Sequence, residues 1–184
     1  PVLKHRGLRF KDLNHNGRLD PYEDWRLSAS ERAVDLVARM TLEEKAGMML
    51  IDTLNANVGG GVPPTATDYI DNQLMSRFIL RNPVTATPDG KPATGFSGAQ
   101  VTPLEIANFT NAIQQLREGT RLGIPALFKS NARNHIDPDA RAGINEASGA
   151  FSAFPKEAGI AAAALGEGDM SAVRSFATVM GDEW

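Results

Sequence analysis

The sequence contains no cysteine, and this absence excludes several kinds of chemistry. No disulfide framework, thiolate metal site or cysteine nucleophile can be built. A dominant charge of one sign is also missing, because 22 acidic residues face 19 lysines and arginines, for a formal net charge of −3. Such a balance gives no electrostatic basis for binding nucleic acid or an anionic membrane. No apolar run approaches the roughly 20 residues that a membrane span needs.

What is present is the composition of a globular chain. Of its 184 residues, 42% are hydrophobic and 22% are charged, which is enough apolar material to bury a real core. The chain opens P-V-L-K without a Met or a signal peptide, so we expect it to begin inside a longer or processed product. It ends in a segment where Val173, Phe176 and Met180 recur at helical spacing after a candidate N-cap, Asp169.

Periodicity predicts two helices early in the chain. Ser30 is the candidate cap of the first, and Thr41 begins the second, where Glu44 completes a capping box. The short apolar segment 46–53 is predicted to be a buried strand. Segment 54–64 is rich in Gly and Pro and is predicted to be a loop, without the Lys-Ser/Thr that a phosphate-binding loop requires.

The middle of the chain has the pattern of a βαβ unit. After a short helix over 68–75, we expect a strand over 76–81, a long loop over 82–101, a helix from Thr102 to Gly119 and a strand over 124–130. Repeated units of this kind indicate an α/β fold with a parallel sheet. The chain is long enough for the first few units of a (β/α)₈ barrel or for a small open α/β sheet, and the pattern alone does not choose between them.

Segment 12–23, D-L-N-H-N-G-R-L-D-P-Y-E, matches the spacing of a calcium-binding loop of the EF-hand type. The predicted ligands, with Arg18 offering its backbone carbonyl, are Asp12, Asn14, Asn16, Arg18, Asp20 and Glu23. Three carboxylates predict a modest affinity and a structural ion. The alternative is a polar Asx-rich turn that binds nothing. A single such loop, with no second copy in the chain, is predicted to fix the N-terminal segment and not to signal.

Several runs together resemble glycoside hydrolase family 3, the family of many β-glucosidases and exo-β-glucanases. The first is R-A-V-D-L-V-A-R-M-T-L-E-E-K-A-G-M-M at 32–49. The later runs are R-F-I-L-R (77–81), A-N-F-T-N-A-I-Q-Q-L (107–116), R-L-G-I-P-A-L-F (121–128) and A-F-P-K-E-A-G-I-A-A-A (153–163). The leading segment is also similar to the calcium-type leader of a secreted bacterial branch. Their order and spacing cover nearly the whole chain.

The resemblance implies a (β/α)₈-like first domain and a second α/β domain downstream. It also implies retaining hydrolysis at the non-reducing end of β-glucosides, by two carboxyl groups about 5 Å apart. In the family the nucleophile stands in a Ser-Asp-Trp context and the acid/base lies beyond it. Neither that context nor the family's sugar-binding Lys-His pair occurs here. We therefore expect no catalytic residue in this chain and no activity from the chain alone.

One sugar-binding segment is expected to remain, S-N-A-R-N-H-I-D at 130–137. It follows a predicted strand, and binding groups in barrels lie at the carboxyl ends of strands. Where the family carries an Asp that grips sugar hydroxyls, this chain has Asn131, whose amide both donates and accepts hydrogen bonds. Asn131, Arg133 and His135 are the candidate ligands for a β-glucoside oligosaccharide. A polar loop without a ligand is the alternative.

Two domains are predicted: a leader over 1–28 that carries the calcium-type loop, and an incomplete barrel domain over 29–184. Two functions stay open. The first is the N-terminal part of an exo-acting β-glycosidase, and the second is a calcium-stabilised carbohydrate-binding module without catalysis. A permanently occupied site of modest affinity suits surroundings rich in calcium, so we expect a periplasmic or extracellular location.

Overall fold

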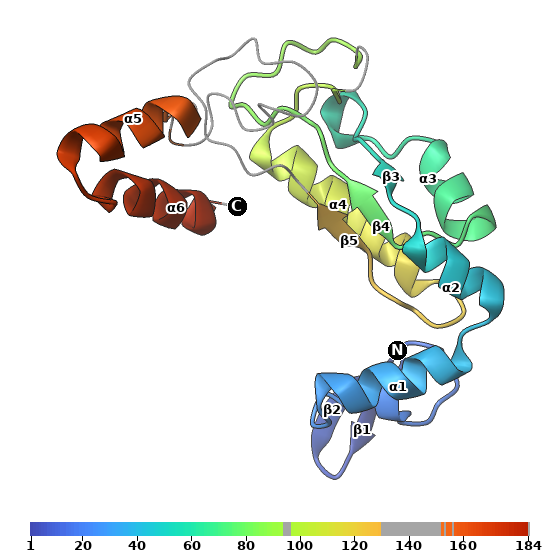
Figure 1. Cartoon of the computed structure of the whole chain (residues 1–184). Coiled ribbons are helices and arrows are strands. Elements are labelled where there is room, and N and C mark those ends of the chain that lie inside the picture. The colour runs from blue at the N-terminus through green and yellow to red at the C-terminus, as the bar shows by residue number, and fades with distance from the viewer. Residues whose placement is uncertain (94–96, 130–151, 153, 156, 184) are drawn as a thin grey trace. The chain divides into compact units, whose positions relative to one another are not determined.

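The computed structural model describes residues 1–93, 97–129, 152, 154–155 and 157–183, which form helices and short strands (Figure 1). The strands are β1 Val2–His5, β2 Leu8–Lys11, β3 Asp52–Thr53, β4 Arg77–Ile79 and β5 Leu127–Lys129. The α-helices are α1 Ala29–Arg39, α2 Leu42–Met49, α3 Thr65–Thr67, α4 Pro103–Glu118, α5 Glu157–Glu167 and α6 Ser171–Glu183. Short 3-10 turns lie at η1 Pro21–Glu23 and η2 Val58–Gly60, and a π-helical turn lies at η3 Asp68–Asn72. Within these ranges, no helix combines the length and hydropathy that crossing a membrane requires.

The chain divides into two compact units that alternate along the sequence. Unit 1 comprises Pro1–Asp52, Pro64–Phe78 and Ala112–Leu127, and unit 2 comprises Thr53–Pro63, Ile79–Asn111 and Phe128–Trp184. The predicted boundary between a leader ending at 28 and a barrel domain beginning at 29 stays a prediction.

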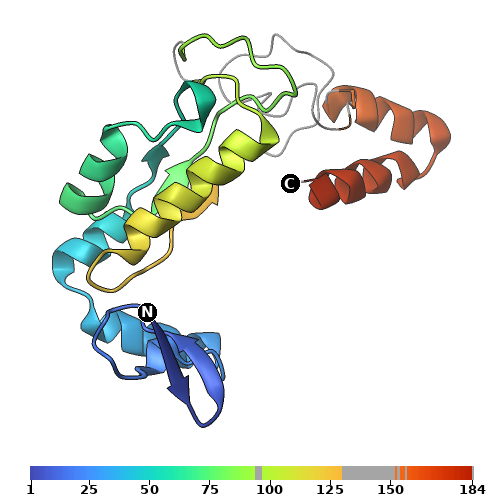
Figure 2. The same cartoon turned by 180° about the vertical axis from the view of Figure 1, so that it is seen from behind.

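Unit 1 begins with an antiparallel hairpin of β1 and β2, in which Val2 pairs with Lys11 and His5 with Leu8 (Figure 2). The two turn residues, Arg6 and Gly7, have φ values of 48° and 81°. Positive φ at both positions is the geometry of a type I′ turn, whose twist suits a two-residue hairpin. The residues before the acidic loop therefore form strands and not the entering helix of a standard EF-hand.

The first two helices begin at capping boxes. Helix α1 is capped by Ser28, whose hydroxyl accepts from the N–H of Glu31 at 3.2 Å. The predicted cap at Ser30 is wrong, because Glu31 stands three residues after Ser28 and completes the reciprocal bond there. The predicted cap of α2 is confirmed, since Thr41 accepts from the N–H of Glu44 at 3.1 Å.

The strand predicted over 46–53 is mostly wrong. Helix α2 continues through Met49, and β3 holds just Asp52 and Thr53. The capping box at Thr41 starts α2, and Gly47 lets this helix pack closely, since a Cβ on Gly47 would lie 2.4 Å from the carbonyl oxygen of Gln73. The helix thus packs directly on backbone, which an apolar pattern does not reveal. The predicted helix over 68–75 also shifts, to the turns at 65–72.

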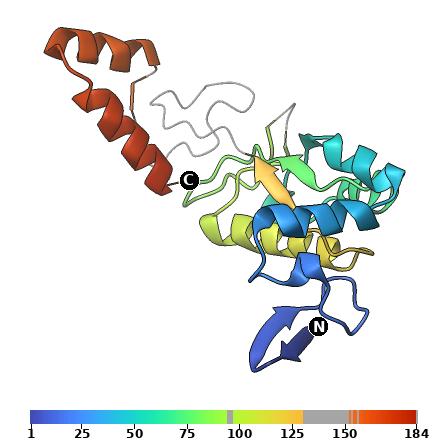
Figure 3. The same cartoon turned by 60° about the horizontal axis from the view of Figure 1, so that its bottom comes forward.

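A three-stranded sheet has the order β3-β4-β5, and Figure 3 shows β4 and β5 side by side. The N–H of Leu127 donates to Ser76 O at 2.8 Å, and the N–H of Leu80 donates to Lys129 O at 3.0 Å. Because both partners advance together along the sequence, β4 and β5 are parallel. Helix α4 connects them, so the predicted βαβ unit is confirmed. Its capping box is confirmed too, since Thr102 accepts from the N–H of Glu105 at 3.2 Å.

Each unit has its own buried core. In unit 1 the fully buried side chains include Ile70, Met75, Phe78 and Ile113, and in unit 2 they include Leu54, Val101 and Phe109. Phe109 of α4 contacts Phe128 of β5, with ring centroids 6.3 Å apart. Phe109 and Ile113, four residues apart on α4, are both fully buried.

The last described segment is a helical hairpin. Helices α5 and α6 are joined by a short turn (Figure 1), and Asp169 accepts from the N–H of Ser171 at 2.7 Å. The predicted C-terminal helix is confirmed. The described residues are thus mixed α/β with a small sheet and no closed barrel among them. A partial (β/α)₈ barrel stays a prediction.

Candidate functional site

The loop at 12–23, in unit 1, is closed by the carboxylates at its two ends. Asp12 accepts from the N–H groups of Asn16 and Gly17, both at 3.1 Å. Glu23 accepts from the N–H groups of Leu13 at 2.7 Å and Asp20 at 3.0 Å. Both carboxylates are buried, with 4% of each residue exposed. The chain therefore coils around two acidic side chains that point inward.

The middle of the loop brings three side-chain head groups together. The amide groups of Asn14 and Asn16 both donate to the same oxygen, Oδ2 of Asp20, at 2.7 Å. The other Asp20 oxygen pairs with Nη2 of Arg39 at 3.0 Å. Burial alone would raise the pKa of Asp20, but the hydrogen bonds from the two Asn amides and the charge of Arg39 lower it. Asp20 is therefore held as an anion.

This set of donors fits a hard cation. Calcium binds oxygen atoms of carboxylates, amides and backbone carbonyls. In the hydrogen bonds named above, the donors to Asp12 and Glu23 are all backbone N–H groups, which carry no positive charge. Buried carboxylates without a cationic partner are costly, and a divalent ion offsets that cost. The described residues hold no group of three or more His, Asp or Glu side chains already gathered for a metal. Calcium at this loop stays a prediction that depends on amide and backbone oxygens as well.

The loop is fastened to the rest of unit 1 through Tyr22. Its hydroxyl donates to Leu122 O at 3.2 Å, its N–H donates to Asp35 Oδ2 at 3.1 Å, and its carbonyl accepts from Arg32 Nε at 3.0 Å. Nearby, Gly123 has a φ of 55°, and a Cβ there would lie 2.5 Å from Leu13 O. The loop thus contacts both α1 and the turn that follows α4.

A second polar cluster lies in unit 2, just after β3 and β4. The buried Asn82 amide accepts from Ala56 N–H at 2.8 Å and donates to Ala56 O at 2.9 Å and to Ala99 O at 2.8 Å. Asn55 Oδ1 accepts from Arg81 N–H at 2.8 Å. These amides follow the strands, at the end where α/β folds place binding groups. Their hydrogen bonds shape the backbone of that edge.

The three predicted sugar-binding residues, Asn131, Arg133 and His135, lie outside the described residues. Residues that the sequence reading missed are Tyr22 and Arg39, which hold the acidic loop, and Asn55 and Asn82. An Asn directly after an apolar strand was the available signal for the last two. For Arg39 no signal existed, since its contact with Asp20 spans 19 residues and depends on how α1 packs.

No protein-family model matches the chain. It is 40% identical to a periplasmic beta-glucosidase/beta-xylosidase of Dickeya chrysanthemi over 100% of its own length and 26% of that protein. It is 30% identical to probable beta-glucosidase C of Aspergillus oryzae over 89% of its length and 23% of the relative. It is 29% identical to beta-glucosidase C of Emericella nidulans over 97% of its length and 26% of the relative. The chain spans about a quarter of the length of the curated relatives it matches.

The names of these relatives agree with the family that the motifs, among them those at 32–49 and 121–128, resemble. Together the relatives match the chain from end to end. The resemblance to glycoside hydrolase family 3 is thereby confirmed: the chain is homologous over its whole length to β-glucosidases and β-xylosidases.

Proposed function

We propose that this chain is the N-terminal part of a retaining exo-acting β-glycosidase that removes terminal β-D-glucosyl residues. The observation that carries the proposal is the 40% identity along the whole chain to a protein named periplasmic beta-glucosidase/beta-xylosidase. Since that match spans 26% of the relative, most of the enzyme is contributed by residues beyond this chain, including the remaining barrel units and a second α/β domain.

The proposed contribution of this chain is to position the sugar. In the sequence, β4 ends shortly before Asn82 and β5 ends directly before the segment that begins at Ser130. Asn131, Arg133 and His135 then bind sugar hydroxyls, with amide, guanidinium and imidazole groups as donors. Retaining hydrolysis requires a nucleophile and an acid/base that flank one glycosidic bond, and both come from downstream residues.

We further propose that the loop at 12–23 binds one structural calcium ion. The convergence of Asn14, Asn16 and Asp20 on one point, with Asp12 and Glu23 buried beside it, supports the proposal. The ion would neutralise these carboxylates and take no part in the hydrolysis. A periplasmic or extracellular location, where calcium is abundant, agrees with the name of the bacterial relative, a periplasmic beta-glucosidase/beta-xylosidase.

The test compares this chain with the longer product of its reading frame. Both are purified and assayed on aryl β-glucosides and aryl β-xylosides. The longer product is expected to hydrolyse these substrates, and the 184-residue chain is expected to be inactive. Turnover by the chain alone would show that the catalytic carboxylates lie within it. Sugar binding without any turnover by the longer product would instead establish a carbohydrate-binding module.

The sugar-binding residues are tested in the longer product with Arg133→Ala. Loss of a charged hydrogen bond of about 1–3 kcal/mol lowers kcat/KM by roughly 5- to 150-fold. The matched control is Arg174→Ala, an exposed arginine on α6. An unchanged kcat/KM in the Arg133 variant removes this residue from the sugar site.

A further inference from the structure

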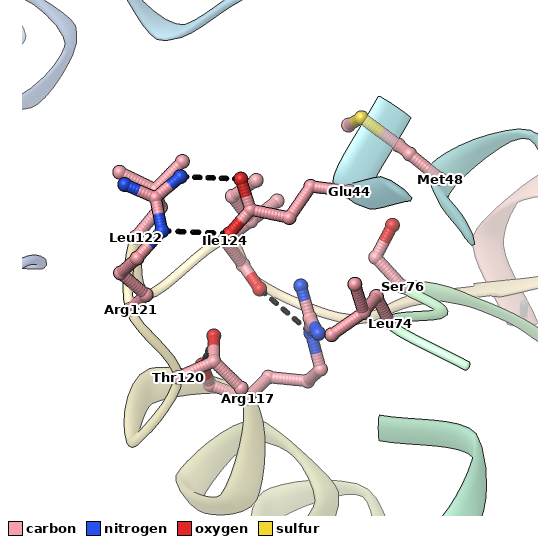
Figure 4. A pocket seen from close by; sticks show the side chains of 9 residues that line it. All are labelled: Glu44, Met48, Leu74, Ser76, Arg117, Thr120, Arg121, Leu122 and Ile124. Atoms are coloured by element: carbon pink, nitrogen blue, oxygen red, sulfur yellow. Dashed lines mark hydrogen bonds and ion pairs between the residues drawn. The ribbon is translucent and has the colours of Figure 1, made fainter. Parts of the chain in front are cut away.

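A cavity of about 70 Å³ lies within unit 1, and none of the predicted calcium ligands or sugar-binding residues lines it. Its walls come from α2, the start of β4, the end of α4 and the turn after α4. The lining residues are Glu44, Met48, Leu74, Ser76, Arg117, Thr120, Arg121, Leu122 and Ile124 (Figure 4). A cavity of this size with polar walls has room for more than one water molecule.

Arg117 is the unusual member of this wall. It is an arginine with 4% of its surface exposed. Its Nε donates to Ile124 O at 3.0 Å, and within the described ranges neither Nη group donates a hydrogen bond. Figure 4 shows the guanidinium directed toward the space between Glu44 and Ser76. An arginine has five N–H donors, and the four on the Nη groups of Arg117 have no acceptor in the described part of the chain.

The acidic side chain in the wall is already engaged. Glu44 accepts from Arg121 Nε at 3.0 Å and from Arg121 Nη2, and its Oε2 also accepts from Thr41 N–H at 2.9 Å. The charged residues that line the cavity are Glu44, Arg117 and Arg121, so the lining side chains carry one more positive charge than negative. Asp71 also attracts Arg117 but is exposed and does not line the cavity.

Burial of a guanidinium is unfavourable unless its charge and donors are satisfied. Burial lowers the pKa of Arg117, whereas the charges of Glu44 and Asp71 raise it. Arginine nevertheless stays protonated in proteins. The Ser76 hydroxyl is an additional donor, since Ser76 is 3% exposed and no hydrogen bond of its hydroxyl is present in the described part of the chain. A group of hydrogen-bond donors with a net positive charge is a favourable binding site for an anion.

We propose that this cavity binds a small monovalent inorganic anion of the size of chloride, held by the Nη groups of Arg117 and the hydroxyl of Ser76. The anion neutralises the buried guanidinium at the point where α2, β4 and α4 meet. Its role is structural, because the cavity is lined by residues of unit 1 and by none of the proposed sugar-binding residues. The inference does not depend on the glycosidase activity.

The test uses the purified 184-residue chain, with circular dichroism as the check of folding. The ³⁵Cl NMR linewidth is measured at constant sodium concentration while gluconate, which is too large for the cavity, replaces chloride. We expect excess broadening that saturates with chloride and is displaced by bromide. The Arg117→Met variant is expected to lose this broadening, whereas the control Arg174→Met keeps it. Broadening that is absent from the wild type, or equal in the Arg117→Met variant, overturns the proposal.

A direct measurement covers the case in which Arg117→Met does not fold. Crystals of the wild-type chain grown in sodium bromide are examined by anomalous diffraction. A bromine peak in the cavity beside the Arg117 guanidinium supports the anion site. Solvent density there without an anomalous signal means that water alone fills the cavity, and the proposal is then wrong.

Discussion

The hydroxyl of Tyr22 donates to the carbonyl oxygen of Leu122 at 3.2 Å, although the two residues are 100 positions apart in the sequence. Tyr22 is 4% exposed, so this bond is made in a buried setting. It joins the end of the acidic loop to the turn after α4, and it is one of three hydrogen bonds by which Tyr22 holds the loop in unit 1.

Tyr22→Phe is expected to destabilise the chain by about 1–3 kcal/mol, because Leu122 O loses its buried donor. Urea unfolding of both proteins measures this difference. The control is Tyr69→Phe, which removes an exposed bond to Asp52 and is expected to cost less. Equal stability of the Tyr22→Phe variant and the wild type would mean that the loop is not fastened by this bond.

Calcium is expected to raise the unfolding midpoint of the wild-type chain. A ligand that binds just the folded form at 100 times its Kd stabilises it by about 2.7 kcal/mol. Thermal unfolding in EDTA and in millimolar calcium measures the effect. Glu23→Gln is expected to weaken it strongly, because a bidentate carboxylate closes such loops. The exposed Glu43→Gln variant should respond as the wild type does. Identical midpoints, with no calcium in a bound-metal analysis, contradict the prediction.

Asn82→Ala is expected to be strongly destabilising. The change leaves the N–H and carbonyl of Ala56 and the carbonyl of Ala99 without their side-chain partner, and each orphaned buried group costs about 1–3 kcal/mol. Chemical unfolding measures the loss. Asn111→Ala, at an exposed position of α4, is the control and is expected to remain close to the wild type. A small loss for Asn82→Ala would mean that water replaces the amide.

The ion pair of Glu44 and Arg121 is expected to make stability depend on pH. Burial would raise the pKa of Glu44, but the hydrogen bonds from Arg121 and Thr41 and the charges of Arg121 and Arg117 lower it below its ordinary value of 4.5. A lowered folded pKa means that this stabilisation is fully present above pH 4.5. It is lost as the pH falls through the folded pKa.

The measurement compares Tm of the wild type and Glu44→Gln between pH 7 and pH 2. The difference should be largest near neutral pH and should shrink below about pH 4. Asp182→Asn, exposed at the end of α6, is the control for general acid effects. A Tm difference that stays constant across the range would exclude the carboxylate of Glu44 as the source.

The local signals in the sequence predicted those elements whose ends are fixed by nearby residues. The capping boxes at Thr41 and Thr102 placed the starts of α2 and α4, because both partners of each box lie three residues apart. The strand at 46–53 was predicted wrongly, because the packing of Gly47 on Gln73 is a contact across 26 residues. The local pattern of apolar and polar residues does not reveal contacts between residues that are far apart in the sequence.

The same distinction applies to the candidate sites. The acidic loop was found because its six predicted ligands occur within twelve residues of sequence. Arg117 and Ser76 were not found, because 41 residues separate them and neither belongs to a motif. A buried arginine is recognised once the three-dimensional surroundings show that its Nη groups lack an acceptor in the described chain.

The bond from Tyr22 to Leu122 also sets an order of events during synthesis. A ribosome that adds about 5–20 residues per second needs roughly 5–20 s to advance from Tyr22 to its acceptor, which lies 100 residues later. During that interval the nascent chain carries the acidic loop without its final anchor. The N-terminal hairpin and the acidic loop therefore reach their fully bonded arrangement in unit 1 only after Leu122 has been synthesised.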